Sequence, residues 1–191
     1  MPLKGGLNSR PILMKNKNCK NSNLNEQNNN HTPVDSAFYR KIVFDMFDSN
    51  ASDRISNGSP MHAISIFEAM LSYATREVKI FCSKLATEVF GSDDVCDALE
   101  NALKKGVRVR VVTQSTPDET KFKKILTENN LLIVSRDEEI NAIEVNFAVM
   151  DDKAFRYEPK NSAIKAFACA NDTSSASVLS NDFDEIIART A

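Results

Sequence analysis

Arg156 and Glu158 are the two residues whose types and spacing could most directly support chemistry. They are two positions apart at the end of a predicted strand, so both side chains point to the same face. There, Arg156 could bind a phosphate oxygen while Glu158 polarises a water molecule. The alternative is an ordinary exposed ion pair, which carries no function.

Other chemistry-bearing residues favour structural roles. Asp151 and Asp152 could be metal ligands, but two acids followed by Lys153 at a hairpin tip are more typical of a turn. His62, in the first turn of a predicted helix, has no identifiable nucleophile or orienting carboxylate, which favours a place near the surface or the helix cap. The four cysteines show no C-x-x-C spacing, which indicates a reducing compartment and argues against zinc. We therefore predict neither a metal site nor a cofactor.

Arg108 and Arg110 alternate with valines along residues 107–113. They could form a basic edge that contacts nucleic acid. The same alternation is also how a half-buried strand presents a solvated face, so both interpretations stay open.

Charge divides the chain into two parts. The first 32 residues contain five basic residues and one acidic residue, so the remaining 159 carry a net charge of −6, against −2 for the whole chain. An acidic domain is a poor general binder of nucleic acid, because nonspecific affinity comes from neutralising phosphates, although a local basic stripe could still bind. No apolar run reaches the ~20 residues that a membrane span needs, and no signal peptide is apparent, so we expect a cytoplasmic protein.

The sequence predicts one domain preceded by a tail and an arm. Residues 1–32 are rich in Asn and lack a hydrophobic period, which is typical of a disordered tail. Residues 33–59 are expected to form a helical arm outside the core, followed by a loop. Residues 60–191 should form the domain, whose first helix has Ser59 as N-cap and Pro60 at its first position.

The expected domain is an α/β fold with a mixed, mostly parallel sheet flanked by helices. Strands and helices alternate up to residue 135, at a spacing that requires right-handed crossovers and parallel neighbours. Thr116 and Glu119 have the spacing of a capping box that begins one of these helices. A hairpin, a further strand and a closing helix follow. The expected strands are 78–82, 107–113, 131–135, 143–150, 154–157 and 164–169, and the expected helices begin near residues 34, 60, 92, 116 and 173.

Three stretches in this order, 67–81, 98–113 and 145–151, resemble the phospholipase D-like superfamily, and the resemblance covers residues 60–191. Active members carry H-x-K-x-x-x-x-D, in which the His attacks phosphorus, the Lys holds phosphate oxygens and the Asp supports the catalytic histidines. Here the three positions are Asn146, Ala148 and Lys153. Asn cannot form the phosphoenzyme and Ala cannot neutralise a phosphate, so the resemblance implies the fold without the histidine mechanism.

A subset of the superfamily offers a second pattern, with H-F-x-x-x-D on one strand, R-x-E on the returning strand and N-D before the last helix. The corresponding residues here are Asn146-Phe147 with Asp151, then Arg156 and Glu158, then Asn171-Asp172. This resemblance implies an accessory protein of a bacterial mobile-element or phage-defence locus. It makes Asn146, Asp151, Arg156 and Glu158 the candidate site residues.

These residues support three functional hypotheses. The first is a non-catalytic phospholipase D-like subunit that acts by assembly or binding, together with a partner protein, in a bacterial antiviral defence system. The second is a phosphodiesterase or nuclease with an unconventional site at the four candidate residues. The third is a nucleic-acid-binding module that uses Arg108, Arg110 and the basic tail.

The resemblance also implies a homodimer, because half-domains of this superfamily pair. In residues 143–150 the odd positions are apolar and should face the core, which leaves Glu144, Asn146, Ala148 and Met150 on the other face. In paired members this face meets its symmetry mate, and an isologous contact would cover it here.

Removal of residues 1–32 should leave the folded domain intact, because a segment of this composition buries too little apolar surface to offset the conformational entropy lost on folding. A truncation that starts near Thr32 is expected to keep its thermal midpoint when unfolding is followed by circular dichroism. A loss of many degrees would show that the tail is packed.

Overall fold

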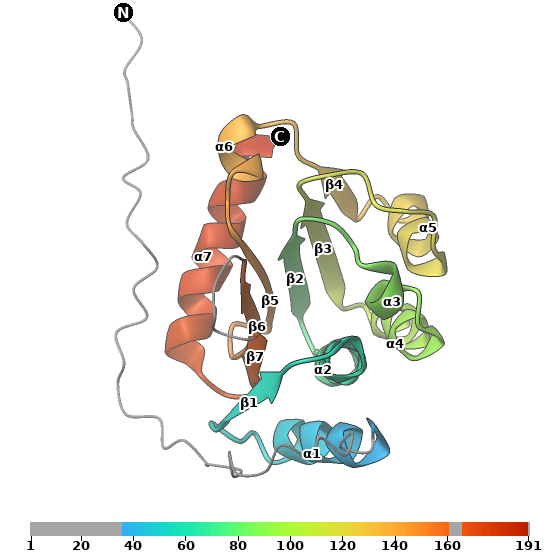
Figure 1. Cartoon of the computed structure of the whole chain (residues 1–191), viewed down its shortest axis with the longest axis vertical. Coiled ribbons are helices and arrows are strands. Elements are labelled where there is room, and N and C mark those ends of the chain that lie inside the picture. The colour runs from blue at the N-terminus through green and yellow to red at the C-terminus, as the bar shows by residue number, and fades with distance from the viewer. Residues whose placement is uncertain (1–35, 161–165, 191) are drawn as a thin grey trace, which may run out of the picture.

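The computed structural model describes residues 36–160 and 166–190, so the tail expected at residues 1–32 lies outside the described residues. Helices and strands alternate along the described chain (Figure 1). The helices are α1 (Ser36–Asp48), α2 (Pro60–Tyr73), α3 (Thr87–Phe90), α4 (Asp93–Lys104), α5 (Lys121–Glu128), α6 (Glu138–Asn141) and α7 (Thr173–Thr190). The strands are β1 (Arg54–Asn57), β2 (Glu77–Cys82), β3 (Arg108–Thr113), β4 (Leu132–Val134), β5 (Val145–Met150), β6 (Ala154–Pro159) and β7 (Ala166–Cys169).

The described strands form one seven-stranded sheet in the order β1-β7-β6-β5-β2-β3-β4. β2, β3 and β4 run parallel, as their helical crossovers require. β5 is antiparallel to both β2 and β6, and β7 is antiparallel to β6 and β1. The α/β class with a mixed sheet is confirmed, but the expectation of a mostly parallel sheet is wrong, because β5, β6 and β7 pair antiparallel with all of their neighbours.

Helices cover both faces of the sheet. The closing helix α7 packs on one face, whereas α2, α3, α4 and α5 lie on the other side (Figure 1). Each face has its own hydrophobic cluster, one built around Phe81, Phe155 and Phe183 beneath α7, the other around Ile66, Ile80 and Leu99 beneath α2 and α4. Within residues 36–160 and 166–190, none of the helices has the length and apolar character needed to span a bilayer.

Burial on both faces corrects the expected dimer surface. Phe147 and Val149 belong to the α7 cluster, and Ala148 and Met150 belong to the cluster beneath α2. Ala148 is 0% exposed and Met150 is 1% exposed within the single chain. Met150 therefore cannot be a dimer contact, because the chain's own helices already cover it. The homodimer itself stays a prediction, and only the Asn146 end of this face is open.

The segment before residue 60 is part of the core, contrary to the expectation of an external arm. Helix α1 buries Tyr39 and Val43 in the same cluster as α2. The expected loop from 48 to 59 contains β1, which pairs with β7 through residues such as Asn57 and Ala166. A four-residue strand has too short a pattern to be recognised before its distant partner is known.

The expected capping box at Thr116 does not begin helix α5. That helix begins at Lys121, and Thr120 is its N-cap, with the hydroxyl accepting a hydrogen bond from the Lys123 amide at 3.1 Å. Asp118 instead receives a hydrogen bond from Lys84 at 2.7 Å, which holds the preceding loop near the end of β2. At α7 the expected N-D pair does contribute a cap, because Asp172 accepts from the Ser175 amide at 3.0 Å.

The turn between β5 and β6 is fastened to the start of β2 by one carboxylate. Asp151 accepts hydrogen bonds from the Thr75 amide and hydroxyl at 2.8 Å each, from the Arg76 amide at 2.9 Å and from the Glu77 amide at 2.8 Å. Asp151 and Asp152 both have left-handed backbone conformations, with φ of 53° and 55°, which confirms the turn interpretation. Partial burial opposes ionisation of Asp151, but these hydrogen bonds outweigh it and lower the pKa of the carboxyl.

The Asp151→Asn variant should lose about 1–3 kcal/mol of unfolding free energy, because Asn keeps the left-handed backbone but replaces an acceptor oxygen by an amide that cannot accept. The folded-state pKa of Asp151 lies below its unfolded value. Its contribution is therefore complete above about pH 4 and is lost as the pH falls through the folded pKa. Urea unfolding across this range tests both points.

Asp152→Asn is the matched control, since it makes the same change in the neighbouring left-handed position. Asp152 accepts from Ser180 at 2.6 Å but from no backbone amide in the described hydrogen bonds, so its loss should be smaller. Equal losses in the two variants, or a loss for Asp151→Asn that does not change with pH, would contradict the assigned role.

Candidate functional site

A cavity of about 610 Å³ opens at one end of the sheet, on the face that carries α2 and α3. Apolar side chains of α2 and α3, including Phe67, Val89 and Phe90, line one wall. The sheet supplies most of the polar groups. These are Asn57 at the end of β1, Ser83 after β2, Asn146 on β5, and Arg156 and Glu158 on β6.

Strand pairing brings three of the four candidate residues together. Asn146 is directly opposite Glu158, and Ala148 is directly opposite Arg156, in the antiparallel ladder of β5 and β6. Side chains that are opposite each other share a face of the sheet. Arg156 therefore supplies, from the neighbouring strand, a cation beside the position where the superfamily motif has its lysine.

Arg156 is almost fully buried, with 7% of its side chain exposed. Its Nη1 donates to Glu158 Oε2 at 3.1 Å. With the Asn57 amide oriented to satisfy its neighbours, the Asn57 oxygen accepts from Nε and Nη2 of Arg156 at 2.7 and 3.2 Å. The guanidinium also lies over the Phe67 ring, 5.3 Å from its centroid. The Arg156 side of the pair is thus buried and hydrogen-bonded, whereas the Glu158 side chain is 40% exposed, so the pair differs from the fully exposed ion pair of the alternative interpretation.

Glu158 is ionised at neutral pH although it is half-buried. Burial tends to raise the pKa of its carboxyl, but the Arg156 charge and hydrogen bonds from Arg156 and Asn146 outweigh burial and lower it. Asn146 links the carboxylate to the backbone, since its Nδ2 donates to Glu158 at 3.1 Å and its Oδ1 accepts from the Ser83 amide at 2.8 Å. All three side chains are therefore held in fixed orientations.

The described lining of the cavity offers no activated nucleophile. Cys82 is buried, and burial raises the pKa of its thiol to about 12 against the lowering effect of Arg156, so it is protonated at neutral pH. The Ser59 hydroxyl accepts from the His62 amide at 3.3 Å as the N-cap of α2. His62 is not among the lining residues, and it stacks on Tyr39 with ring centroids 3.6 Å apart. The cap-adjacent placement expected for His62 is confirmed.

Asp151, the fourth candidate, is at the opposite end of β5 and does not line the cavity. Lys153, at the motif's Asp position, donates to the Asn50 side chain at 2.9 Å in the same turn region. Both residues serve the hairpin rather than the cavity. The proposed grouping of Asp151 with Asn146, Arg156 and Glu158 in one site is therefore wrong.

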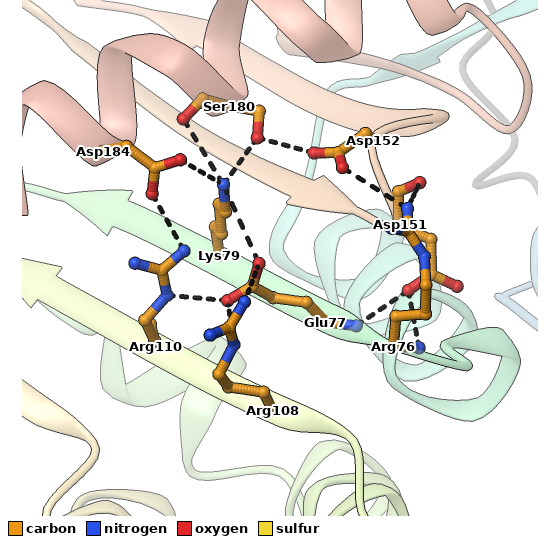
Figure 2. A network of polar contacts seen from close by, with 9 residues as sticks. All are labelled: Arg76, Glu77, Lys79, Arg108, Arg110, Asp151, Asp152, Ser180 and Asp184. Carbon is orange, nitrogen blue, oxygen red and sulfur yellow. Dashed lines mark hydrogen bonds and ion pairs between the residues drawn. The ribbon is translucent and has the colours of Figure 1, made fainter.

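Arg108 and Arg110 do not form a free basic edge. Both pair with Glu77, at 2.7 Å in each case, and Arg110 also pairs with Asp184 of α7 at 2.9 Å (Figure 2). Arg108 is two-thirds exposed and Arg110 is largely covered. Their charges are compensated within the chain, which weakens the case for phosphate binding here.

The same network ties α7 to the sheet. Lys79 on β2 is 4% exposed and donates to Ser180 Oγ at 2.6 Å and to Asp184 at 2.8 Å (Figure 2). Ser180 in turn donates to Asp152, which pairs with Arg76 at 3.3 Å. The positive and negative groups of this network alternate and pair with one another, so we assign the network a structural role.

Sequence reasoning missed Asn57 and Ser83 as site residues. Asn57 ends a strand that was expected to be loop, and Ser83 contributes a backbone amide, which no side-chain pattern signals. The one available signal was the Gly58-Ser59-Pro60 run, which correctly indicated that a helix begins beside this point.

Neither known family models nor curated protein sequences match the chain. Among solved structures, TrmBL2, an archaeal chromatin protein, aligns with a TM-score of 0.52 and 9% identity over 72% of this chain and 53% of its own. NucT from Helicobacter pylori aligns with a TM-score of 0.50 and 13% identity over 71% of this chain and 94% of its own. Nuc from Salmonella typhimurium, a phospholipase D family member, aligns with a TM-score of 0.45 and 14% identity over 63% and 83%.

Likeness at these identities concerns the fold alone. The chain shares its α/β fold with NucT over most of the length of both chains. It spans about half the length of the archaeal chromatin protein.

Restoring the motif lysine should damage the fold, because Ala148 is fully buried beside Arg156. We expect Ala148→Lys to cost at least about 3 kcal/mol of unfolding free energy, through overpacking and an unpaired like charge. Ala148→Met, similar in volume and uncharged, should cost about 1–3 kcal/mol. Chemical denaturation of both variants gives the difference, and equal losses would show that Arg156 does not exclude a second cation.

Proposed function

We propose that this chain is a phospholipase D-like domain that binds nucleic acid and does not cleave it by the histidine route. The observation that carries the proposal is the cavity itself. Asn146, Arg156 and Glu158 are ordered around an accessible space at the motif strand, while Asn146 and Ala148 replace the residues that would attack and hold a phosphate.

The hydrogen bonds that hold the polar groups of the site favour ligand binding over catalysis. The Arg156 side chain is fully engaged with Glu158 and Asn57, and Asn146 is held by two hydrogen bonds, so the polar groups are organised before a ligand arrives. Preorganised groups lower the entropic cost of binding. A histidine-type reaction would additionally need a nucleophile, and Cys82 is protonated at neutral pH.

Nucleic acid is the proposed ligand class because a DNA-binding protein shares this fold. The TrmBL2 structure is described as showing a novel mode of DNA binding, and that description belongs to the archaeal protein. For this chain it supports a role related to nucleic acid. Membership of a bacterial antiviral defence system is also part of the proposal, and it is supported by the resemblance of Asn146-Phe147, Arg156 and Glu158 to the accessory subset.

The purified protein should bind labelled oligonucleotides without shortening them. Fluorescence anisotropy measures binding, and denaturing electrophoresis of the same samples measures cleavage. Since only a few charges line the cavity, the logarithm of affinity should fall with the logarithm of salt concentration with a slope of about −1 to −2.

Ala86→Trp tests whether the cavity is the binding site, because Ala86 is exposed and lines it. This variant should weaken binding about tenfold or more by filling the space. Ala142→Trp makes the same change at an exposed position outside the cavity and should bind like the unmodified protein. Equal binding by both variants, or no binding by the unmodified protein, would refute the proposal, and strand cleavage would favour the unconventional phosphodiesterase instead.

A further inference from the structure

We propose that the cavity receives an unpaired nucleobase that carries an exocyclic amino group, and that Glu158 accepts a hydrogen bond from that group. This inference rests on the proposed function and specifies which part of a nucleic acid enters the cavity. The alternative is that the cavity binds the phosphodiester backbone.

The charge of the lining argues against a phosphate. The described lining contains two cations, Lys84 and Arg156, and two anions, Glu88 and Glu158. Lys84 is further neutralised by Asp118 at 2.7 Å. A phosphate would meet no excess positive charge, and close to Glu158 it would meet an ionised carboxylate. Both cations of this lining are already paired with carboxylates, so they would hold a phosphate less strongly than unpaired cations would.

The hydrogen-bonding state of the polar groups selects a donor. Within the described residues, the recorded hydrogen bonds to Glu158 all end on Oε2, from Arg156 and from Asn146. The Oε1 atom has no recorded partner there, and 40% of the Glu158 side chain is exposed. An ionised carboxylate is an acceptor only, so a ligand at this atom must present N–H or O–H groups. The amino group of a base presents N–H groups. In protein–DNA complexes, the carboxylates of Asp and Glu accept hydrogen bonds from the cytosine amino group.

The volume of the cavity and its apolar lining residues fit an uncharged ring. The cavity volume of about 610 Å³ lies within the range of small-molecule sites. Much of the lining that α2 and α3 supply is apolar, and it includes Phe67 and Phe90, whose ring centroids are 4.7 Å apart. Single-stranded nucleic acids present unstacked bases that combine apolar faces with hydrogen-bonding edges. A base could therefore contact the apolar wall while its edge meets Glu158.

The test compares three single-stranded probes of about 12 units, namely oligodeoxycytidine, oligothymidine and an abasic chain with the same phosphates. Anisotropy should show about tenfold tighter binding of oligodeoxycytidine than of either other probe. Competition by free deoxycytidine but not by thymidine should give the same order on the unmodified protein. This second measurement does not depend on any variant folding.

Glu158→Gln should reduce the affinity for oligodeoxycytidine about tenfold and leave oligothymidine nearly unchanged, because it removes the carboxylate charge from the acceptor. Glu128→Gln, the same change at an exposed position on α5 outside the cavity, should have no effect. Equal binding of all three probes would overturn the base inference and leave the proposed function intact. Failure of every probe to bind would refute the proposed function, and a cytidine preference that persists in Glu158→Gln would overturn the role of Glu158.

Discussion

The pairing of β5 with strands on both sides is the constraint on which the rest of the structure depends. Because β5 lies between β2 and β6, its backbone groups are used by neighbours and its two faces belong to two hydrophobic clusters. Its last four residues are buried within the chain. Of this strand, Asn146 and Phe147 line the cavity. The same register places Arg156 beside Ala148, and this arrangement fixes what the site can contain.

Compensated charge is common to the cavity and the α7 network. In the cavity Arg156 is matched by Glu158, and at the other end of the sheet Lys79 and Arg110 are matched by Asp184. Arg156 and Lys79 are buried, so removal of an acidic partner would leave a buried unpaired charge, which costs more than the pair contributes. The chain's cations are thus mostly committed to internal partners in the described region. The proposed binding would then depend on shape and hydrogen bonds more than on net charge.

Much of the fold could be predicted from local patterns. The helix after Ser59-Pro60 and the alternating Val/Arg strand β3 carry their own signals of caps and periodicity. β1 could not be predicted, because its four residues become a strand only through pairing with β7. Only the part of the site that depends on local spacing could be predicted. The two-residue spacing of Arg156 and Glu158 correctly indicated that their side chains lie together. The grouping with Asp151 failed because Asp151 and Asn146 lie at opposite ends of β5, and the length of the strand separates them.

The order in which the strands pair during folding determines when the cavity is complete. Arg54 pairs with Cys169 and Asn57 with Ala166, so β1 has no partner until most of the chain has been synthesised. Contacts between such distant residues form late, because a long loop must close first. Asn57, which holds the Arg156 guanidinium, arrives with this last pairing. The proposed binding site is therefore complete only after β1 has paired with β7, and a partly folded chain would lack Asn57 beside Arg156 even with most of its secondary structure in place.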